Sequence, residues 1–138
     1  YELEQSKIIL QEHGYIVRTL GIPYGDYNND VKITGTMFYD SIRPSELGLN
    51  SFNNLDKYNL KSYWIVNSTS LDEINSRIDE INDNDWLIFM LHHVRKNKNR
   101  EYTISPMDLE ETIRHIKEKG IEIKTISEVL DECYGNRR

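Results

Sequence analysis

The chain has 138 residues, of which 38% are hydrophobic and 29% are charged, as in a globular domain with a substantial core. The formal net charge of -6 argues against a protein that works on nucleic acid or on anionic membranes. The single cysteine, Cys133, excludes an internal disulfide, and no apolar run approaches the roughly 20 residues of a membrane span. No signal peptide is recognised. Because residue 1 is tyrosine, we expect a processed product or a piece of a longer protein.

The first third of the chain alternates helical and extended patterns. A helix is predicted over residues 2–13, where Gly14 is placed to end it, and a strand over residues 15–20. The segment 21–29 is dense in turn formers, but two tyrosines, a proline and two glycines exceed what a bare connection needs. A second strand is predicted over residues 34–39, leading into the sequence Asp-Ser-Ile-Arg.

The middle of the chain begins irregularly. Residues 44–59 show little periodicity and are predicted as a long loop, a kind of segment that is often functional. A short strand is predicted over residues 62–66. Ser70 and Glu73 have the spacing of a capping box, in which each side chain accepts a hydrogen bond from the other residue's backbone. They open a predicted helix that reaches residue 81.

The most informative stretch is residues 86–94, in which six apolar residues precede His92 and His93. Such a run is typical of a strand buried on both faces. In parallel α/β folds ligands bind at the carboxyl ends of the strands, where a histidine can exchange a proton near neutral pH. Successive strand residues point to opposite faces, so at most one of the two histidines should face a pocket. Alternatively, the two polar residues simply mark the end of the strand.

The last third continues the alternation. The basic run at residues 95–100 is predicted as a solvated loop, and Ser105 is expected to cap a helix that Gly120 ends. A strand is then predicted over residues 121–126. A final helix from Ser127 to about Cys133 and a loose tail over residues 135–138 complete the predictions. Alternating strands and helices predict one α/β domain over residues 1–138 with a mostly parallel sheet.

Familiar catalytic and metal signatures are missing. No two of the four histidines stand at the spacing of an H-E-x-x-H zinc helix, and His13 and His115 lie on polar helix faces, where surface placement is expected. There is no G-x-S-x-G elbow, no phosphate-binding glycine loop and no C-x-x-C. The residues alone therefore leave one candidate acid–base histidine and one unusual loop, both following strands at the same predicted edge of the sheet.

Those two segments, in this order, resemble the later motifs of the polysaccharide deacetylase family (NodB-like, carbohydrate esterase family 4). Pro23-Tyr24-Gly25, followed by Asp26-Tyr-Asn, resembles the family's R-P-P-Y-G motif, and residues 87–92 resemble its last motif, a hydrophobic strand ending in a histidine. The pattern Y-T-I-S, a helix, G-I-E-I-K-T and E-V-L resembles the family's closing segment. The likeness spans nearly the whole chain.

The resemblance implies a distorted (β/α) barrel that removes acetyl groups from N-acetylated sugars. A divalent metal, held by one Asp and two His, polarises the acetyl carbonyl and the attacking water, and a second Asp acts as the base. Carried over to this chain, His92 protonates the leaving amine, with His93 as the alternative, and the backbone N–H of Tyr24 holds the oxyanion. The residues expected to shape the substrate pocket are Pro23, Gly25, Asp40, Trp64 and Leu91.

Part of the family pattern is absent. No T-F-D-D-like stretch and no H-x-x-x-H occurs, and Gly21 stands where the family has the arginine that partners the catalytic base, although Arg18 could lie near. We therefore expect a C-terminal portion of the enzyme, a partial barrel that binds no metal by itself, with zinc the expected metal of the complete enzyme. A glycan substrate and a homodimer or a complementing N-terminal segment are the expected partners.

By resemblance, the location is extracellular or at the cell envelope. One alternative is a non-catalytic deacetylase-like module that binds glycan or a protein partner. Another is an unrelated small α/β regulator.

Overall fold

A computed structural model describes residues 1–25, 27–97 and 99–135 of the chain. The chain divides into two compact units. Unit 1 consists of Tyr1–Glu46, Asn54–Lys61 and Thr125–Arg138, and unit 2 consists of Leu47–Asn53 and Ser62–Lys124. Three features named in the sequence fall at least partly outside the described residues: Asp26 of the proline–tyrosine loop, Lys98 of the basic run, and residues 136–138 of the tail.

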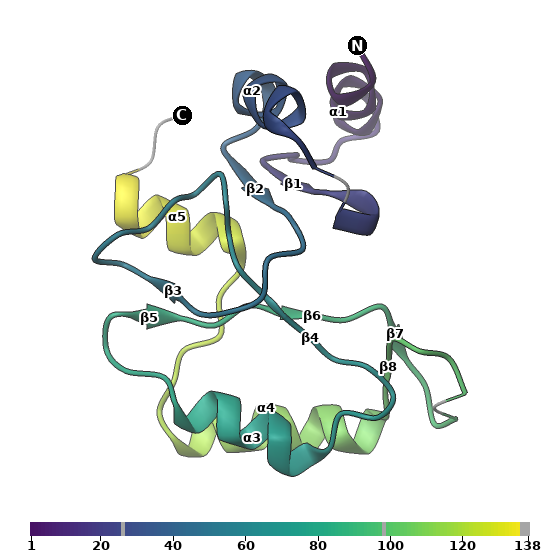
Figure 1. The fold of residues 1–138 in the computed structure, drawn as a ribbon, viewed down its shortest axis with the longest axis vertical. Helices are drawn as coiled ribbons and strands as arrows, with labels where there is room; N and C mark the ends of the chain where they lie inside the picture. Colours follow the sequence, from purple (N-terminus) through teal and green to yellow (C-terminus); the bar gives the residue numbers. More distant parts are fainter. Residues whose placement is uncertain (26, 98, 136–138) are drawn as a thin grey trace. The chain divides into compact units, whose positions relative to one another are not determined.

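Unit 1 is built around a pair of parallel strands (Figure 1). Its elements are α1 (Glu2–Glu12), β1 (Thr19–Gly21), the 3-10 turn η1 (Pro23–Gly25), α2 (Asn29–Phe38), β2 (Ser41–Arg43) and α5 (Ile126–Tyr134). Leu20 of β1 lies opposite Ile42 of β2, whose side chain is fully buried. The other edge of β2 is also bonded, because the Ile42 amide donates to the carbonyl of Lys57 and the Leu60 amide to the carbonyl of Ile42. The strand predicted from residue 15 therefore exists, but it begins only at Thr19.

Residues 34–39, predicted as a strand, are helical in α2 up to Phe38, so that prediction is wrong. Asn28 caps the helix by accepting a hydrogen bond from the Val31 amide at 2.9 Å, with Asp30 in the first turn, where the helix dipole favours a carboxylate. Gly35 is buried against the β1–β2 pair. Packing and capping thus override the β-propensity of the threonines and aromatic residues in this segment.

Helix α1 confirms the predicted N-terminal helix and ends at Glu12, with His13 as its C-cap. None of its residues is buried, and polar contacts hold it to the end of α2. The hydroxyl of Tyr39 donates to the carbonyl of Leu3 at 2.9 Å, and the ammonium group of Lys7 donates to the carbonyl of Phe38. Tyr39 is itself buried, so it joins the two helices.

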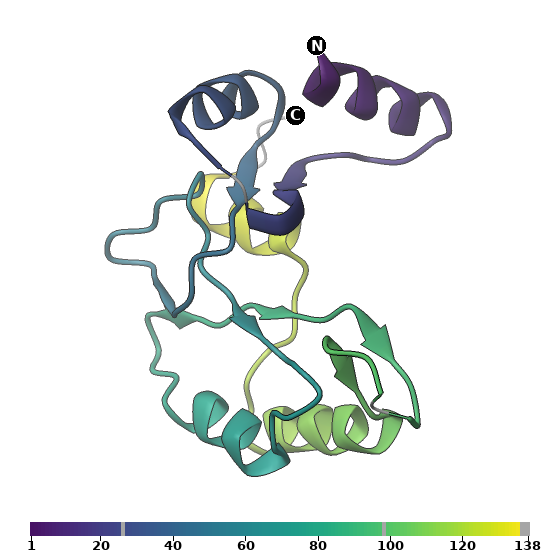
Figure 2. The same ribbon diagram turned by 45° about the vertical axis from the view of Figure 1, so that its right-hand side comes forward.

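Unit 2 packs two helices against short strands (Figures 1 and 2). Its elements are β3 (Asn50–Ser51), β4 (Tyr63–Trp64), α3 (Leu71–Asp79), β5 (Asp85–Trp86), β6 (Phe89–Met90), β7 (His93–Val94), β8 (Thr103–Ile104) and α4 (Pro106–Glu118). The centre of its core is a cluster of buried isoleucines: Ile65, Ile74, Ile78 and Ile104. The predicted helices are confirmed, because Ser70 and Ser105 accept hydrogen bonds from the backbone at Glu73 and Asp108.

The apolar run at residues 86–94 is not one buried strand. It is divided among β5, β6 and β7, and its residues are half-buried or exposed. Each piece pairs with a different segment: β5 runs antiparallel to β3, β6 parallel to β4, and β7 parallel to β8. Because the pairing partner changes every few residues, the run does not lie in one sheet whose two faces are both covered. The prediction of burial on both faces is therefore wrong.

The strand predicted over residues 121–126 is also wrong. Residues 121–125 form no strand, and Ile123 is 59% exposed although Ile121 packs on the core of unit 2. The final helix is capped by Thr125 and not by Ser127. The Thr125 side chain accepts a hydrogen bond from the Glu128 amide, while the Glu128 carboxylate accepts one from the Thr125 amide.

Three of the four strand pairs in the described residues are parallel, and β3–β5 is antiparallel. The predicted partial barrel and the single domain over residues 1–138 stay predictions. Among the described residues, no helix combines the length and the apolar character that a membrane crossing requires.

Candidate functional site

The Pro23–Gly25 turn at the carboxyl end of β1 holds Tyr24 in an unusual conformation. Its φ of 56° and ψ of 1° lie in the left-handed region, and no other non-glycine residue in the described ranges has a positive φ. This conformation costs an L-residue roughly 1–2 kcal/mol. The side chain of Tyr24 is fully exposed, so it gains no packing in return. Backbone strain of this kind concentrates at functional sites.

The turn is held by residues at the end of β2 and just after it. The Gly25 amide donates to the carbonyl of Ile22 at 3.3 Å, and the amide of the buried Ile22 donates to the carbonyl of Arg43 at 3.1 Å. A Cβ on Gly25 would collide with the Ser45 side chain, and Gly25 itself has a φ of 70°. Only glycine fits there, and Tyr24 is therefore presented on a fixed loop.

Arg43 adds a cation to this corner. Gly21 and Arg43 are opposite one another in the β1–β2 register, and a Cβ on Gly21 would lie 3.0 Å from Nη2 of Arg43. The side chain is half-buried, and burial lowers its pKa. The sequence predicted no role for Arg43, because nothing local indicates that it lies beside Gly21.

Arg18, which the sequence offered as a replacement for the missing arginine, is engaged elsewhere. Its guanidinium donates two hydrogen bonds to Asp131 of α5, at 2.8 and 2.9 Å, and one to Asp40 at 2.7 Å. These hydrogen bonds, with Asp131 first, raise the pKa of Arg18. Arg18 and Asp40 immediately precede β1 and β2, whereas the Pro23–Gly25 turn follows β1. They therefore lie at the opposite ends of these strands from Tyr24.

Asp40, predicted to shape the substrate pocket, lines a pocket in unit 1 with a volume of ≈ 320 Å³. The other lining residues are Arg18, Lys57, Leu130, Tyr134 and Gly135. The ammonium group of Lys57 lies over the rings of Tyr58 and Tyr134, at 4.9 and 5.3 Å from their centroids. The Asp40 carboxylate accepts a hydrogen bond from Arg18. This ion pair explains the position of the Asp40 side chain without a bound ligand.

The two candidate histidines in unit 2 have different surroundings. His92 is exposed. The centroid of its ring lies 4.7 Å from that of the Tyr102 ring, and the two ring planes make an angle of 35°. His93 is half-buried on β7, where burial, and next the positive charges of Arg95 and Arg100, lower its pKa. The lowered pKa increases the neutral fraction of the His93 imidazole near pH 7.

Tyr102 was missed as a site residue. His93 pairs with Thr103 in the parallel β7–β8 register, so the residues that precede these two strands, His92 and Tyr102, become neighbours. The amide of His93 donates to the carbonyl of Tyr102 at 3.0 Å and fixes this register. The only signal in the sequence was an aromatic residue just before a short β-like stretch, and it could not reveal the pairing.

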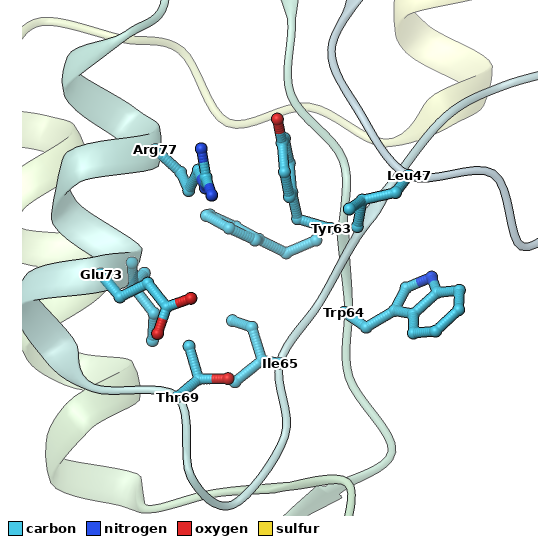
Figure 3. A pocket seen from close by; sticks show the side chains of 9 residues that line it. Leu47, Tyr63, Trp64, Ile65, Thr69, Glu73 and Arg77 are labelled. Carbon is cyan, nitrogen blue, oxygen red and sulfur yellow. The ribbon is translucent and has the colours of Figure 1, made fainter.

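Trp64 and Leu91 lie on neighbouring segments of unit 2. Trp64 pairs with Met90 in the β4–β6 register, Leu91 follows directly, and both side chains are more than a third exposed. Trp64 also lines a pocket with Tyr63, Phe89, Glu73 and Arg77, among others, and Figure 3 shows its indole pointing away from Arg77 and Tyr63. This pocket holds only ≈ 120 Å³, less than the roughly 300 Å³ at which ligand pockets begin. It is too small for a sugar ring with its substituents.

The predicted surface placement is confirmed for His13, which is exposed, but not for His115. His115 is half-buried, and its Nε2 lies 2.9 Å from Oδ1 of Asp79. Within residues 1–25, 27–97 and 99–135, no three His, Cys, Asp or Glu side chains gather as a metal site would require. These residues do not fit a metal on their own.

The predicted site residues are thus divided between the two units. The Pro23–Gly25 turn and Asp40 belong to unit 1, whereas Trp64, Leu91 and the two histidines belong to unit 2. Comparison with protein-family models, with curated proteins and with solved structures found no match for this chain.

Proposed function

We propose that this chain is part of a metal-dependent carbohydrate N-deacetylase that hydrolyses acetamide groups on a glycan. The observation that carries the proposal is the conformation of Tyr24. A fully exposed tyrosine is held in the left-handed region by a turn in which Gly25 admits no side chain. This arrangement costs stability and buries nothing, which supports a role in binding or catalysis for the backbone at this point.

Each proposed role uses a group that the structure describes. Hydrolysis adds water across the acetamide C–N bond and releases acetate and a free amine. The backbone N–H of Tyr24 stabilises the oxyanion that forms on the acetyl oxygen. His92 gives its proton to the departing nitrogen, and the Tyr102 ring beside it restricts the orientation of the imidazole. The described residues do not fit a metal, so the ligands of the metal implied by the resemblance would come from other residues, and no step is assigned to it.

The remaining predictions belong to the same proposal. Pro23, Gly25 and Asp40 of unit 1 and Trp64 and Leu91 of unit 2 are proposed as glycan-binding residues. A second copy of the chain or a complementing segment is the proposed partner. An extracellular or cell-envelope location follows from the same resemblance. The alternative, a non-catalytic module that binds glycan, is favoured by one observation. The Tyr24 ring is fully exposed, as expected for a ring that stacks on a sugar.

The test is release of acetate from N-acetylated chitooligosaccharide, with and without added zinc, by the longer protein of which this chain is proposed to be a part; residues 1–138 alone should release none. We expect zinc-dependent acetate release, and we expect His92→Ala to lower kcat roughly 10²-fold, the usual scale for a general acid. His13→Ala, which removes an exposed histidine from unit 1, is the control and should leave kcat unchanged. Glycan binding without acetate release would favour the binding module, whereas full acetate release by His92→Ala would show that His92 is not the acid.

A further inference from the structure

The connection between β7 and β8, at the edge of unit 2 in Figure 1, concentrates positive charge in an acidic chain. Residues 95–100 contain four of the 17 Lys and Arg residues and no acidic residue, although the whole chain has 23 Asp and Glu residues. The side chains of Arg95, Lys96 and Arg100 are all exposed. The contacts of the two arginines distinguish this loop from the other charged surfaces of the chain.

Within residues 1–25, 27–97 and 99–135, Arg95 and Arg100 are the only arginines whose guanidinium has no hydrogen-bond or ion-pair partner among those residues. The other described arginines all have one: a carboxylate for Arg18, Arg77 and Arg114, and at least a backbone carbonyl for Arg43. An acidic chain has ample carboxylates for such pairs. The two open guanidinium groups therefore leave a positive charge that the fold itself does not neutralise.

Arg95 shares a face of its strand with His93. The Arg95 amide donates to the carbonyl of Ile104 at 3.0 Å, so the β7–β8 pairing continues one residue beyond the end of β7. Alternate residues of a strand point to the same side, which places the side chains of His93 and Arg95 together. His92 belongs to the other side, where its ring lies beside that of Tyr102.

Arg100 approaches His93 from the neighbouring strand. The His93 amide donates to the carbonyl of Tyr102 at 3.0 Å, and Arg100 precedes Tyr102 by two residues, a span of at most about 7 Å. The backbone between them is also anchored, because the carbonyl of Glu101 accepts a hydrogen bond from the Asn67 amide at 2.6 Å. Both guanidinium groups thus extend from fixed backbone on the two strands that meet at His93.

The imidazole of His93 responds to both charges. Burial first, and then the positive charges of Arg95, Arg100 and His92, lower its pKa. No carboxylate is among the groups that act on it. Like charges that gather without a counter-charge repel one another and destabilise the folded chain. A bound anion would remove this repulsion.

We propose that His93, Arg95 and Arg100 form a binding site for the carboxylate groups of an acidic glycan. The planar fork of each guanidinium matches the two oxygens of a carboxylate. The imidazole can take up a proton when the anion arrives and add a third favourable charge. The site rests on the geometry of β7 and β8, whereas the glycan as its occupant rests on the proposed function. Because His92 lies on the other side of the strand, the carboxylate belongs to a different sugar from the one that His92 would protonate.

An acidic glycan suits this site better than a nucleic acid does. A nucleic acid carries a charge about every 3.4 Å along each strand, and a protein binds it with many cations in a row. The chain has a net charge of -6, which repels such a dense polyanion. A glycan with one carboxylate in every second sugar needs only a local group of cations, and that is what the β7–β8 connection supplies.

The first experiment compares two tetrasaccharides that both contain N-acetylglucosamine. Hyaluronan tetrasaccharide alternates it with glucuronate, whereas chitotetraose is uncharged. NMR follows the imidazole of His93 in the chain through a pH titration with each sugar. We expect hyaluronan to bind saturably and to raise the pKa of His93, because a nearby anion stabilises the imidazolium. Chitotetraose should leave the pKa of His93 unchanged.

The second experiment removes the cations. Arg95→Gln and Arg100→Gln should each raise the Kd for hyaluronan about 3- to 5-fold, the scale of an exposed ion pair, and the double variant about 10-fold. Without sugar, each change should raise the pKa of His93, since it removes a positive charge. Lys117→Gln removes an exposed cation from α4 of the same unit and should alter neither quantity. Urea midpoints no lower than that of wild type confirm that the variants fold.

Other outcomes would overturn the proposal. One is an unchanged Kd for hyaluronan in the double variant. Another is tighter binding of single-stranded DNA of equal charge, which would assign the cations to a phosphate backbone. Displacement of hyaluronan by an equal concentration of inorganic phosphate would make this a site for a free ion. If the longer protein releases no acetate from any acetylated glycan, the proposed function fails, and the hyaluronan titration still decides the role of Arg95 and Arg100.

Discussion

A Cβ atom on Gly35 of α2 would lie 2.7 Å from Cδ1 of Ile42 on β2, closer than carbon atoms in contact normally approach. Ile42 is fully buried, and the Leu20 side chain lies 3.4 Å from the same point on the other strand. The missing side chain thus lets the helix approach the β1–β2 pair closely. Glycine in a helix interior costs about 1 kcal/mol relative to alanine, and this approach is the physical reason for its presence.

Gly35→Ala should therefore destabilise the protein although it improves helix propensity. Overpacking a filled core costs about 1–3 kcal/mol, which exceeds the gain of about 1 kcal/mol from alanine. Ile42→Val removes Cδ1, so the double variant should lose less stability than the two single changes added together. Urea denaturation measures all three. Ile33→Ala on the exposed side of α2 is the control and should be neutral or slightly stabilising. Simple additivity would show that the two side chains do not compete for one space.

Tyr24→Gly and Tyr24→Ala separate the backbone of Tyr24 from its ring. Both changes remove the exposed ring, but only glycine adopts the left-handed conformation without strain. We expect Tyr24→Gly to be more stable than Tyr24→Ala by about 1 kcal/mol in urea denaturation. If the backbone N–H serves the oxyanion, the glycine variant should also keep kcat within a few-fold of wild type. A large loss of kcat in both variants would assign the role to the ring.

The sequence predicted elements well where local signals agree. Ser70 and Ser105 begin α3 and α4 as expected, because a hydroxyl that caps a helix is a short-range feature. The segment around Thr34 failed because its β-propensity was weighed without the Asn28 cap and without the contact of Gly35 with β2. The prediction for the apolar run after residue 86 failed because the run pairs with three different segments. Local composition does not indicate which segments pair.

For the candidate site the limit was again long-range pairing. The Pro23–Gly25 turn was visible as an unusual cluster of turn formers, and the structure shows that it does form a tight turn after β1. The neighbours that give the site its chemical character, Arg43 beside Gly21 and Tyr102 beside His92, depend on strand registers. These registers cannot be predicted from the periodicity or the spacing of residues in the sequence.

Asp79 should make the contact between α3 and α4 sensitive to acid. Its Oδ1 accepts a hydrogen bond from Lys119 at 2.6 Å and lies 2.9 Å from Nε2 of His115, and these partners, Lys119 first, lower the pKa of Asp79. A carboxylate with a lowered folded-state pKa stabilises the fold above its ordinary pKa of about 4, and the contribution is lost as the pH falls through the folded-state pKa.

Asp79→Asn should accordingly lower the urea midpoint at pH 7, and the difference from wild type should shrink toward pH 2. Asp83→Asn removes an exposed carboxylate from the same unit and should show no such trend. If the urea midpoints of Asp79→Asn and wild type differ by the same amount at pH 7 and pH 2, the asparagine alters packing and not the charge interaction.

Tyr102 offers a way to decide which histidine is the acid. Its ring lies beside that of His92, whereas His93 is bonded to Tyr102 only through the backbone, from the His93 amide to the Tyr102 carbonyl. Paired rings are worth about 0.5–1.5 kcal/mol, so Tyr102→Leu should lower kcat about 2- to 10-fold if His92 donates the proton from a fixed orientation. Tyr102→Phe keeps the ring and should leave kcat unchanged. If His93 is the acid instead, loss of the Tyr102 ring should have little effect on kcat, and His93→Gln should lower it far more than His92→Gln.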